Sequence, residues 1–193
     1  MNGHQITTGN SSISGRGPMP NGLTVWFTGL PSSGKTTISE AVFEELQSRH
    51  YKVGLIDGDA VRQTICRDLG YTKKDRDENV IRVSELAKIL TRRGIVTLVS
   101  MVSPYRATRK KAYYALGNVL EVYVKASIEA CERRDVKGLY KRARAGEFTG
   151  MTGLDDPYEP PRSPSLICNT EMETRAESVA KVLEAIGQRE AGA

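Results

Sequence analysis

The feature that most constrains this chain is a glycine-rich turn between a short apolar run and an amphipathic helix. Residues 23–28 are rich in β-branched and aromatic side chains and lie between Gly22 and Gly29, which is typical of a buried strand. From Lys35 to His50, apolar residues recur at helical spacing. A strand that passes through such a turn directly into a helix predicts the first βα unit of a parallel sheet.

The turn satisfies the P-loop pattern G-x-x-x-x-G-K-[ST] in the strand-to-helix context that this pattern requires. Its glycines let backbone N–H groups point at phosphate oxygens, and Lys35 and Thr36 are expected to reach the β/γ-phosphates and Mg²⁺. A Gly/Ser-rich turn without a ligand is the alternative, but the agreement of all fixed positions favours nucleoside triphosphate binding. The residues expected to bind the nucleotide are Gly29, Leu30, Pro31, Ser32, Ser33, Gly34, Lys35, Thr36 and Thr37.

Length and charge limit the class of protein. The 193 residues fit one domain with a real core, and the formal net charge is +5. Basic residues concentrate in 62–144, which suits polyanionic small substrates or nucleic acid, although a solvated surface would show the same excess. Only 6% of residues are aromatic, without a stacking array or a basic recognition helix, which argues against a nucleic-acid partner.

The cysteines and the first 21 residues indicate in which cellular compartment the protein is expected. Cys66, Cys131 and Cys168 are odd in number and widely spaced, which predicts neither a disulfide framework nor a zinc site and favours a reducing cytoplasm. Residues 1–21 are rich in Gly, Ser, Asn and Pro and carry no apolar run, so we expect a disordered leader and no signal peptide. No stretch is apolar and long enough to span a membrane, so no membrane partner is expected.

Predicted strands and helices alternate along most of the chain. This order favours an α/β fold, a three-layer α/β/α arrangement of the P-loop NTPase type with a mostly parallel sheet. The further strands are expected at 51–56, 95–102, 120–124 and 166–168. The further helices are expected at 60–69, 75–93, 107–116, 127–134 and 137–144, with a last one begun by the capping box Thr174-x-x-Glu177.

Residues 135–164 break this alternation. After a short basic helical piece they are dominated by glycine and proline, and loops of this length are usually mobile lids or disordered segments. We therefore expect one domain over residues 22–187, a lid over about 135–164 and a flexible tail over 188–193.

Two acids follow the second expected strand, in Asp57-Gly58-Asp59. Ligands of open α/β sheets bind at the carboxyl ends of strands, so these acids are expected to face the P-loop. A plain Asp-Gly turn is the alternative, with Asp59 only capping the helix that follows. The strand at 95–102 lacks the acid that many ATPases place there for Mg²⁺, and no Asn-Lys-x-Asp guanine signature occurs. A P-loop, a basic helix and a mobile lid are the layout of a kinase for small metabolites.

Several motifs in order resemble one family, the adenylylsulfate kinases, from Gly22 to about Ile186. They are Gly29-Leu30-Pro31-Ser32-Ser33-Gly34-Lys35-Thr36-Thr37, Asp57-Gly58-Asp59-Ala60-Val61-Arg62, Arg67-Asp68-Leu69-Gly70-Tyr71, Asp75-Arg76-Asp77-Glu78-Asn79, Ser103-Pro104-Tyr105-Arg106, Asp135-Val136-Lys137-Gly138-Leu139-Tyr140-Lys141, Ala143-Arg144-Ala145-Gly146-Glu147 and Thr152-Gly153-Leu154-Asp155-Asp156-Pro157-Tyr158-Glu159.

The resemblance implies Mg²⁺-dependent phosphoryl transfer from ATP to the 3′-hydroxyl of adenosine 5′-phosphosulfate, in a homodimer that works with an ATP sulfurylase. It implies that Asp59 acts at that hydroxyl as base or orienter, that Thr36 and Asp57 hold Mg²⁺, and that Lys35 is catalytic. Arg144, Cys168 and Thr170 would flank the ATP adenine. The implied acceptor-binding residues are Asp59, Arg62, Tyr71, Arg76, Asn79, Val102, Ser103, Arg106, Lys137, Gly138, Leu139 and Met151.

Ser103 has two readings as a catalytic residue. Members of the family are commonly described with a phosphoserine at this position, yet bound donor and acceptor can react by direct in-line transfer, which we favour. A strand-end hydroxyl that hydrogen-bonds the loop or a ligand is the simpler alternative.

Two positions depart from the family pattern, because Tyr71 and Met151 stand where phenylalanine is usual. Both are expected to touch the acceptor adenine, although Met151 could instead pack on its own lid. The competing functions are a P-loop kinase for another small hydroxyl compound and a nucleotide-binding subunit without catalysis.

Overall fold

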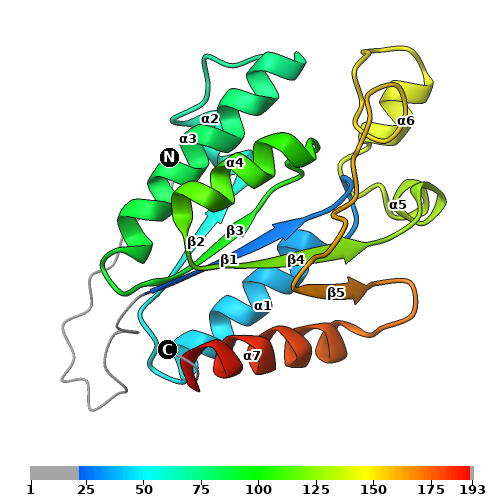
Figure 1. Ribbon diagram of the computed structural model, residues 1–193. Coiled ribbons are helices and arrows are strands. Elements are labelled where there is room, and N and C mark those ends of the chain that lie inside the picture. The colour runs from blue at the N-terminus through cyan, green and yellow to red at the C-terminus, as the bar shows by residue number, and fades with distance from the viewer. Residues whose placement is uncertain (1–21, 192–193) are drawn as a thin grey trace, which may run out of the picture.

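The computed structural model describes residues 22–191, which form a parallel five-stranded sheet between two layers of helices (Figure 1). The strand order is β2-β3-β1-β4-β5, and every neighbouring pair is parallel, as the alternating pattern predicts. The strands are β1 (Leu23–Thr28), β2 (Val53–Asp57), β3 (Val96–Ser100), β4 (Val119–Lys125) and β5 (Leu166–Asn169).

Helices cover both faces of the sheet. On one face lie α1 (Lys35–Ser48) and α7 (Arg175–Ala191), and on the other lie α3 (Lys73–Thr91) and α4 (Arg106–Leu116) (Figure 1). The short helices α2 (Gly58–Gln63) and α5 (Ile128–Arg134) follow the carboxyl ends of β2 and β4, and α6 (Leu139–Arg144) follows α5. This places the P-loop, the Asp57 end of β2 and the chain after β4 at one edge of the sheet, where ligands of such folds bind.

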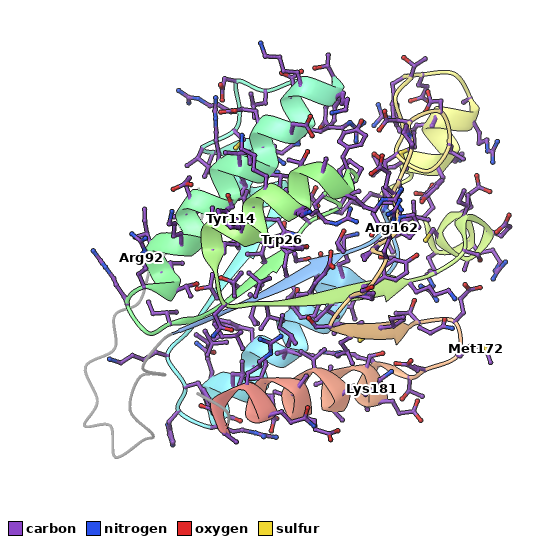
Figure 2. All side chains as sticks on the ribbon, in the orientation of Figure 1. Trp26, Arg92, Tyr114, Arg162, Met172 and Lys181 are labelled. Carbon is purple, nitrogen blue, oxygen red and sulfur yellow. The ribbon has the colours of Figure 1, made fainter. Side chains whose placement is uncertain are left out.

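Two apolar clusters hold the layers together. Val25 and Phe27 of β1 pack in the cluster under α1 and α7, whereas Trp26 packs in the cluster under α3 and α4 (Figure 2). Successive strand residues point to opposite faces, so the central strand supplies both clusters. All six residues of β1 are buried, which explains its continuous apolar run.

A third cluster joins the lid region to the domain. Met151 packs with Leu30 of the P-loop and with Tyr140 of α6, and all three side chains are buried. The tyrosine hydroxyl also donates to the Pro31 carbonyl at 3.1 Å. Residues 145–155 are thus attached to the P-loop by apolar contacts that their composition did not predict.

Some boundaries differ from expectation. Helix α2 ends at Gln63 and does not reach residue 69, and α3 begins at Lys73 because Thr72 and Asp75 form a capping box. The capping box expected at the last helix is present, with the Glu177 N–H donating to Thr174 Oγ1 at 3.2 Å and the Thr174 N–H donating to the Glu177 carboxylate at 2.7 Å.

The ends of the chain differ from expectation or fall outside the structure. Residues 188–191, expected as a tail, are the last turn of α7. The expected leader at 1–21 and residues 192–193 lie outside the described residues. Within residues 22–191, no helix combines the length and apolarity needed to cross a membrane.

Candidate active site

The P-loop forms a tight cradle at the start of α1. Gly34 caps the helix with φ 101°, and Ser32 also has positive φ, 60°. A side chain at Gly29 could not fit, because its Cβ would lie 2.4 Å from the Val124 carbonyl oxygen. Ser33 Oγ is buried and has no hydrogen-bond partner among the described residues. The loop therefore presents backbone N–H groups and a polar atom without a partner, as a phosphate-binding site requires.

Lys35 is buried in this cradle, with 8% of the residue exposed. Its Nζ donates to the Leu30 carbonyl at 2.6 Å. Burial lowers the pKa of Lys35 to about 8, and the nearby charges only partly offset this effect. An ammonium group held against a neutral carbonyl favours an anion beside it, so the site is prepared for phosphate.

Thr36 and Asp57 form an oxygen-rich pair beside the P-loop. Thr36 Oγ1 donates to Asp57 Oδ2 at 3.3 Å and lies 3.5 Å from Ser100 Oγ. The other carboxylate oxygen of Asp57 accepts the N–H groups of Asp59 at 2.9 Å and Ala60 at 3.2 Å. Asp57 is thus the cap of α2, which corrects the alternative in which Asp59 caps this helix. Hydroxyl and carboxylate oxygens are the ligands that Mg²⁺ prefers.

The Asp59 side chain does not cap α2 and contacts the lid instead. Its exposed carboxylate accepts a hydrogen bond from Lys137 Nζ, and the two side chains form an ion pair. Lys137 precedes α6, whose cap is Gly138 with φ 65°, and Leu139 packs against the third cluster. The structure therefore brings the predicted Asp59 and Lys137 together across the mouth of the site.

Two arginines flank Tyr71 on the other side of the mouth. Arg62 Nη1 donates to the Gly70 carbonyl at 2.6 Å, and its guanidinium lies 4.5 Å from the Tyr71 ring centroid. Arg76 Nε donates to the Tyr71 carbonyl at 2.8 Å. The tyrosine is 67% exposed. This group offers one aromatic face and two cations at a single place, which suits an anionic nucleotide.

Arg76 also contacts the lid. Its guanidinium donates to Thr152 Oγ1 and to the Gly150 carbonyl, and its Nε lies 3.7 Å from Asp156 Oδ2. Asn79, one turn later on α3, is buried, and its Oδ1 has no hydrogen-bond partner among the described residues. Since buried polar atoms are rarely left without a partner, Asn79 Oδ1 marks a place for a ligand group or a water molecule.

Ser103 lies in the segment between β3 and α4. Ser103 is buried, and its backbone φ is 42°. Its hydroxyl donates to Thr28 Oγ1 at 3.0 Å and accepts from Trp26 Nε1 at 3.1 Å. Thr28 Oγ1 in turn donates to the Val102 carbonyl at 2.7 Å. The Ser103 hydroxyl is thus used within the fold, as the strand-end alternative describes.

The last acidic motif of the lid is fixed to the segment that follows Ser103. Tyr105 Oη donates to both oxygens of Asp156 at 3.0 Å, and burial raises the pKa of this tyrosine to about 12. The Glu159 carboxylate accepts the Arg106 N–H at 2.8 Å and lies 3.4 Å from Arg106 Nε. Arg106, predicted as an acceptor residue, is therefore paired with Glu159.

The expected adenine residues are only partly brought together. Thr170 Oγ1 donates to the Ser33 carbonyl at 3.0 Å and lies in a pocket that Gly34 and Thr37 also line. Arg144 lines a different pocket, between α5, α6 and the lid, and pairs with Glu132 at 2.8 Å. The structure thus corrects the expectation that Arg144 lies with Thr170.

Arg134, and not Arg144, lies beside Thr170. Its guanidinium donates to Thr170 Oγ1 at 2.9 Å and to the Thr170 carbonyl at 2.7 Å. Cys168 also departs from expectation, because its thiol is fully buried under α7 and donates to the Ser178 carbonyl at 3.8 Å. Only its backbone could face a nucleotide. The sequence signal for Arg134 was its position in the last turn before the lid.

The comparisons with known proteins agree with this geometry. The sequence profile of the adenylylsulphate kinase family matches residues 21–169. The chain belongs to the adenylylsulfate kinase family. It is 52% identical over 168 residues to the adenylyl-sulfate kinase of Halothermothrix orenii, covering 87% of this chain and 91% of the relative. The adenylyl-sulfate kinase of a Picosynechococcus strain is 50% identical, with 84% and 92% covered.

A solved structure extends the likeness to three dimensions. The Mycobacterium tuberculosis APS kinase CysC in complex with AMPPNP and APS superposes with a TM-score of 0.83 at 37% identity, and the alignment covers 87% of this chain and 99% of that one. The adenylylsulfate kinase family is thus supported by both sequence and fold.

The two departures from the family pattern behave differently. Tyr71 is exposed between two arginines, but Met151 is only 5% exposed and packs with Leu30 and Tyr140. This corrects the expectation that both side chains face an acceptor base. In the structure, Met151 packs on its own lid and on the P-loop.

Lys35→Met is expected to abolish turnover without weakening the ligand-free fold at pH 7. The folded pKa of about 8 lies below the ordinary 10.5, so the protonated form destabilises the fold at neutral pH. Between pH 8 and 10.5 the unfolded chain binds more protons, and wild-type stability rises with pH. The variant lacks this rise and should be more stable at pH 7 by about 1–3 kcal/mol.

Urea unfolding at pH 7 and pH 10 measures the difference, and release of ADP measures turnover. The exposed Lys141 provides a matched Lys→Met control, in which neither quantity should change much. A variant that is less stable than wild type at pH 7, or that still turns over, would contradict the assignment.

Tyr71→Ala and Met151→Ala should separate base recognition from packing. A stacked base contact contributes about 1–3 kcal/mol, so loss of the Tyr71 ring should raise the acceptor KM roughly 5- to 150-fold. Loss of the buried Met151 side chain should lower the free energy of unfolding by about 2–5 kcal/mol and change the acceptor KM less.

Steady-state kinetics and urea unfolding check both expectations. Tyr114, 92% exposed on α4, gives a matched Tyr→Ala control (Figure 2). The interpretation of Tyr71 is wrong if Tyr71→Ala and Tyr114→Ala have equal effects on the acceptor KM.

Proposed function

We propose that this chain transfers the γ-phosphoryl group of ATP to the ribose 3′-hydroxyl of adenosine 5′-phosphosulfate, releasing ADP and 3′-phosphoadenylyl sulfate. The observation that carries the proposal is the pairing of two half-sites. A P-loop with buried Lys35 lies at one edge of the sheet, and the exposed Tyr71 between Arg62 and Arg76 lies at the mouth of the same edge. The named activity of the relatives supports the same reaction.

The donor half-site is assigned to the P-loop and its neighbours. Backbone N–H groups of residues 29–37 and the Lys35 ammonium would bind the phosphates. The pocket lined by Thr37, Arg134 and Thr170 adjoins the P-loop and would take the adenosine. Arg134 is already held by Thr170 and can cover a base with its planar guanidinium.

The acceptor half-site is assigned to the mouth side of α2 and α3. Arg62, Arg76 and Arg106 would bind the phosphosulfate oxyanions, since guanidinium forks match such groups. The Asn79 carbonyl oxygen, which lacks a partner in the described residues, would accept a hydrogen bond from the nucleotide. Tyr71 would stack on the acceptor adenine.

Thr36 and Asp57 fit a magnesium ion. The hydroxyl and the carboxylate already lie 3.3 Å apart, and both are hard oxygen donors. When bound, Mg²⁺ neutralises charge on the β- and γ-phosphates. Asp57 keeps its second oxygen on the N–H groups of α2, so the cap holds the carboxylate in place.

Asp59 would act at the acceptor hydroxyl. Its carboxylate orients the 3′-hydroxyl and takes its proton as the oxygen bonds to the γ-phosphorus and the bond to the ADP oxygen breaks. Lys137, now paired with Asp59, would move to substrate oxyanions. The Ser103 hydroxyl is occupied by Trp26 and Thr28, which supports direct transfer over a phosphoserine intermediate.

The proposal extends to domain plan and partners. Residues 22–187 would form the kinase domain, with the lid over about 135–164 closing on the substrates. A homodimer is proposed from the family resemblance. Functional association with ATP sulfurylase is proposed because the acceptor carries a mixed phosphate–sulfate anhydride that another enzyme must form. A cytoplasmic location is part of the same proposal.

A coupled assay of ADP release tests the activity. With ATP and Mg²⁺, release should be at least tenfold faster with adenosine 5′-phosphosulfate than with adenosine 5′-monophosphate, because only the former carries the sulfate that the arginines bind. Equal rates would indicate a kinase for another hydroxyl compound. Binding of ATP without any ADP release would indicate a non-catalytic subunit.

Variants of Asp59 and Ser103 distinguish direct transfer from a phosphoenzyme. Asp59→Asn should lower kcat by about 10²–10⁴-fold, the range of general acid–base catalysis, with ATP binding retained. Ser103→Ala should keep kcat within about tenfold of wild type, because its hydroxyl serves the fold. Labelled ATP with no acceptor should leave no label on denatured wild-type protein. Stoichiometric labelling of Ser103 at a rate matching turnover would overturn direct transfer.

A further inference from the structure

Arg109 is a buried arginine to which the sequence pattern gave no role. It lies on α4, is 2% exposed, and its sequence neighbours Lys110 and Lys111 are exposed. Its guanidinium donates in three directions: Nε to Glu121 Oε1 of β4 at 3.1 Å, Nη1 to the Ser103 carbonyl at 2.6 Å, and Nη2 to the Glu159 carbonyl at 2.7 Å. A charge this deeply buried requires partners, and each of the three nitrogens of Arg109 has one.

The two carbonyls belong to segments far apart in sequence. Ser103 begins the turn 103–106, and Glu159 ends the stretch 156–159, which we call the arm. The same two segments also meet through the Glu159 N–H, which donates to the Pro104 carbonyl at 2.9 Å. Arg109 thus lies behind a junction between the end of β3 and the C-terminal end of the lid.

The arm reaches the acceptor half-site through Asp156. This carboxylate accepts from Tyr105 Oη at 3.0 Å and lies 3.7 Å from Arg76 Nε. Tyr158 lies between Asp156 and Glu159 in the sequence, and its Oη lies 3.0 Å from Thr28 Oγ1. Its ring stacks on that of Tyr123, with the ring centroids 6.1 Å apart. The arm is therefore fixed at several points, and its Asp156 end pairs with a proposed substrate-binding arginine.

We propose that Arg109 is a positioning residue for the acceptor. Its planar fork joins the turn 103–106 and the arm into one rigid unit, and Asp156 on that unit sets the orientation of Arg76. Lysine could not do this, because an ammonium on a flexible stem does not present two donors in a fixed plane. The inference rests on the proposed function only in taking Arg76 as an acceptor ligand.

One consequence is that the moving part of the lid ends before Asp156. Residues 145–155 contact the rest of the domain through the third cluster and through the hydrogen bonds of Gly150 and Thr152 with Arg76. The arm, by contrast, is held by the buried guanidinium. Within the lid proposed over about 135–164, the part before Asp156 would thus move against a fixed arm.

Two variants test the role of the fork. Arg109→Lys keeps a cation beside Glu121 and should fold, but it loses at least one carbonyl contact. Arg109→Gln/Glu121→Gln removes both charges, which avoids leaving one buried alone. The control Glu121→Gln keeps both carbonyl contacts but leaves the buried guanidinium without its counter-charge and changes the group that accepts from Tyr113, so any loss through stability alone will appear there.

Acceptor KM, ATP KM and amide exchange of residues 156–159 are measured for each. For Arg109→Lys we expect a rise in acceptor KM of at least fivefold, and for the double variant at least tenfold, with ATP KM within twofold of wild type. Exchange of the arm without ligands should quicken at least tenfold in both. Glu121→Gln should keep acceptor KM within twofold even if its melting temperature falls.

The outcomes separate this inference from the proposed function. Wild-type protein that makes no phosphorylated product from adenosine 5′-phosphosulfate would overturn the proposed function and the acceptor role together. Active wild type with unchanged exchange in Arg109→Lys would overturn this inference alone. So would a parallel rise of both KM values, or a rise in Glu121→Gln as large as in the double variant. If the double variant fails to fold, Arg109→Lys decides by the same measurements.

Discussion

The close approach of the P-loop to the end of β4 is the constraint on which the rest of the site depends. Gly29 leaves no room for a Cβ beside the Val124 carbonyl, so the loop is pressed onto the sheet. The next residue, Leu30, is then directed under the lid, where a Cβ on Gly153 would lie 2.6 Å from the leucine side chain. Two glycines at two contacts thus connect the phosphate cradle to the sheet on one side and to the lid on the other.

The same region holds three cations that the ligand-free protein pairs with its own groups. Lys35 is buried against a carbonyl, Arg76 is held by the lid, and Lys137 is paired with Asp59. Each cation has a partner that a phosphate or sulfate oxygen could replace. Because an anion relieves more of the desolvation than a neutral carbonyl does, substrates gain binding free energy from contacts that the fold satisfies only in part. The apparent stability of such a protein rises with ligand concentration.

Sequence reasoning succeeded where a local pattern determines the structure. The bounds of β1 and the start of α1 follow from a glycine-bounded apolar run and a motif with fixed geometry. The buried face of a strand is also periodic, and that rule places Cys168 under α7, away from a nucleotide. A family motif names the residue at this position but does not say to which face of the strand its side chain points.

Other features required the three-dimensional structure. Arg134 and Arg144 both end short helices, and no spacing rule tells which of them turns to the P-loop. Arg109 stands in a run of basic residues that looks like a solvated helix face, yet its guanidinium is buried by partners 12 and 50 residues away. The lid had too few apolar residues to predict a cluster, but Met151 completes one with side chains from the P-loop and α6. Contacts between distant segments are the information that composition lacks.

The central place of β1 has a consequence for how the chain is made. Within the described residues, this strand pairs only with β3 and β4, which follow it by more than 60 residues. A ribosome adds about 5–20 residues each second, so this buried, mostly apolar strand waits for several seconds before either neighbour emerges. Non-local parallel pairing is slow to form in any case. The strand that leads into the phosphate cradle is therefore open to chaperones and to aggregation during synthesis.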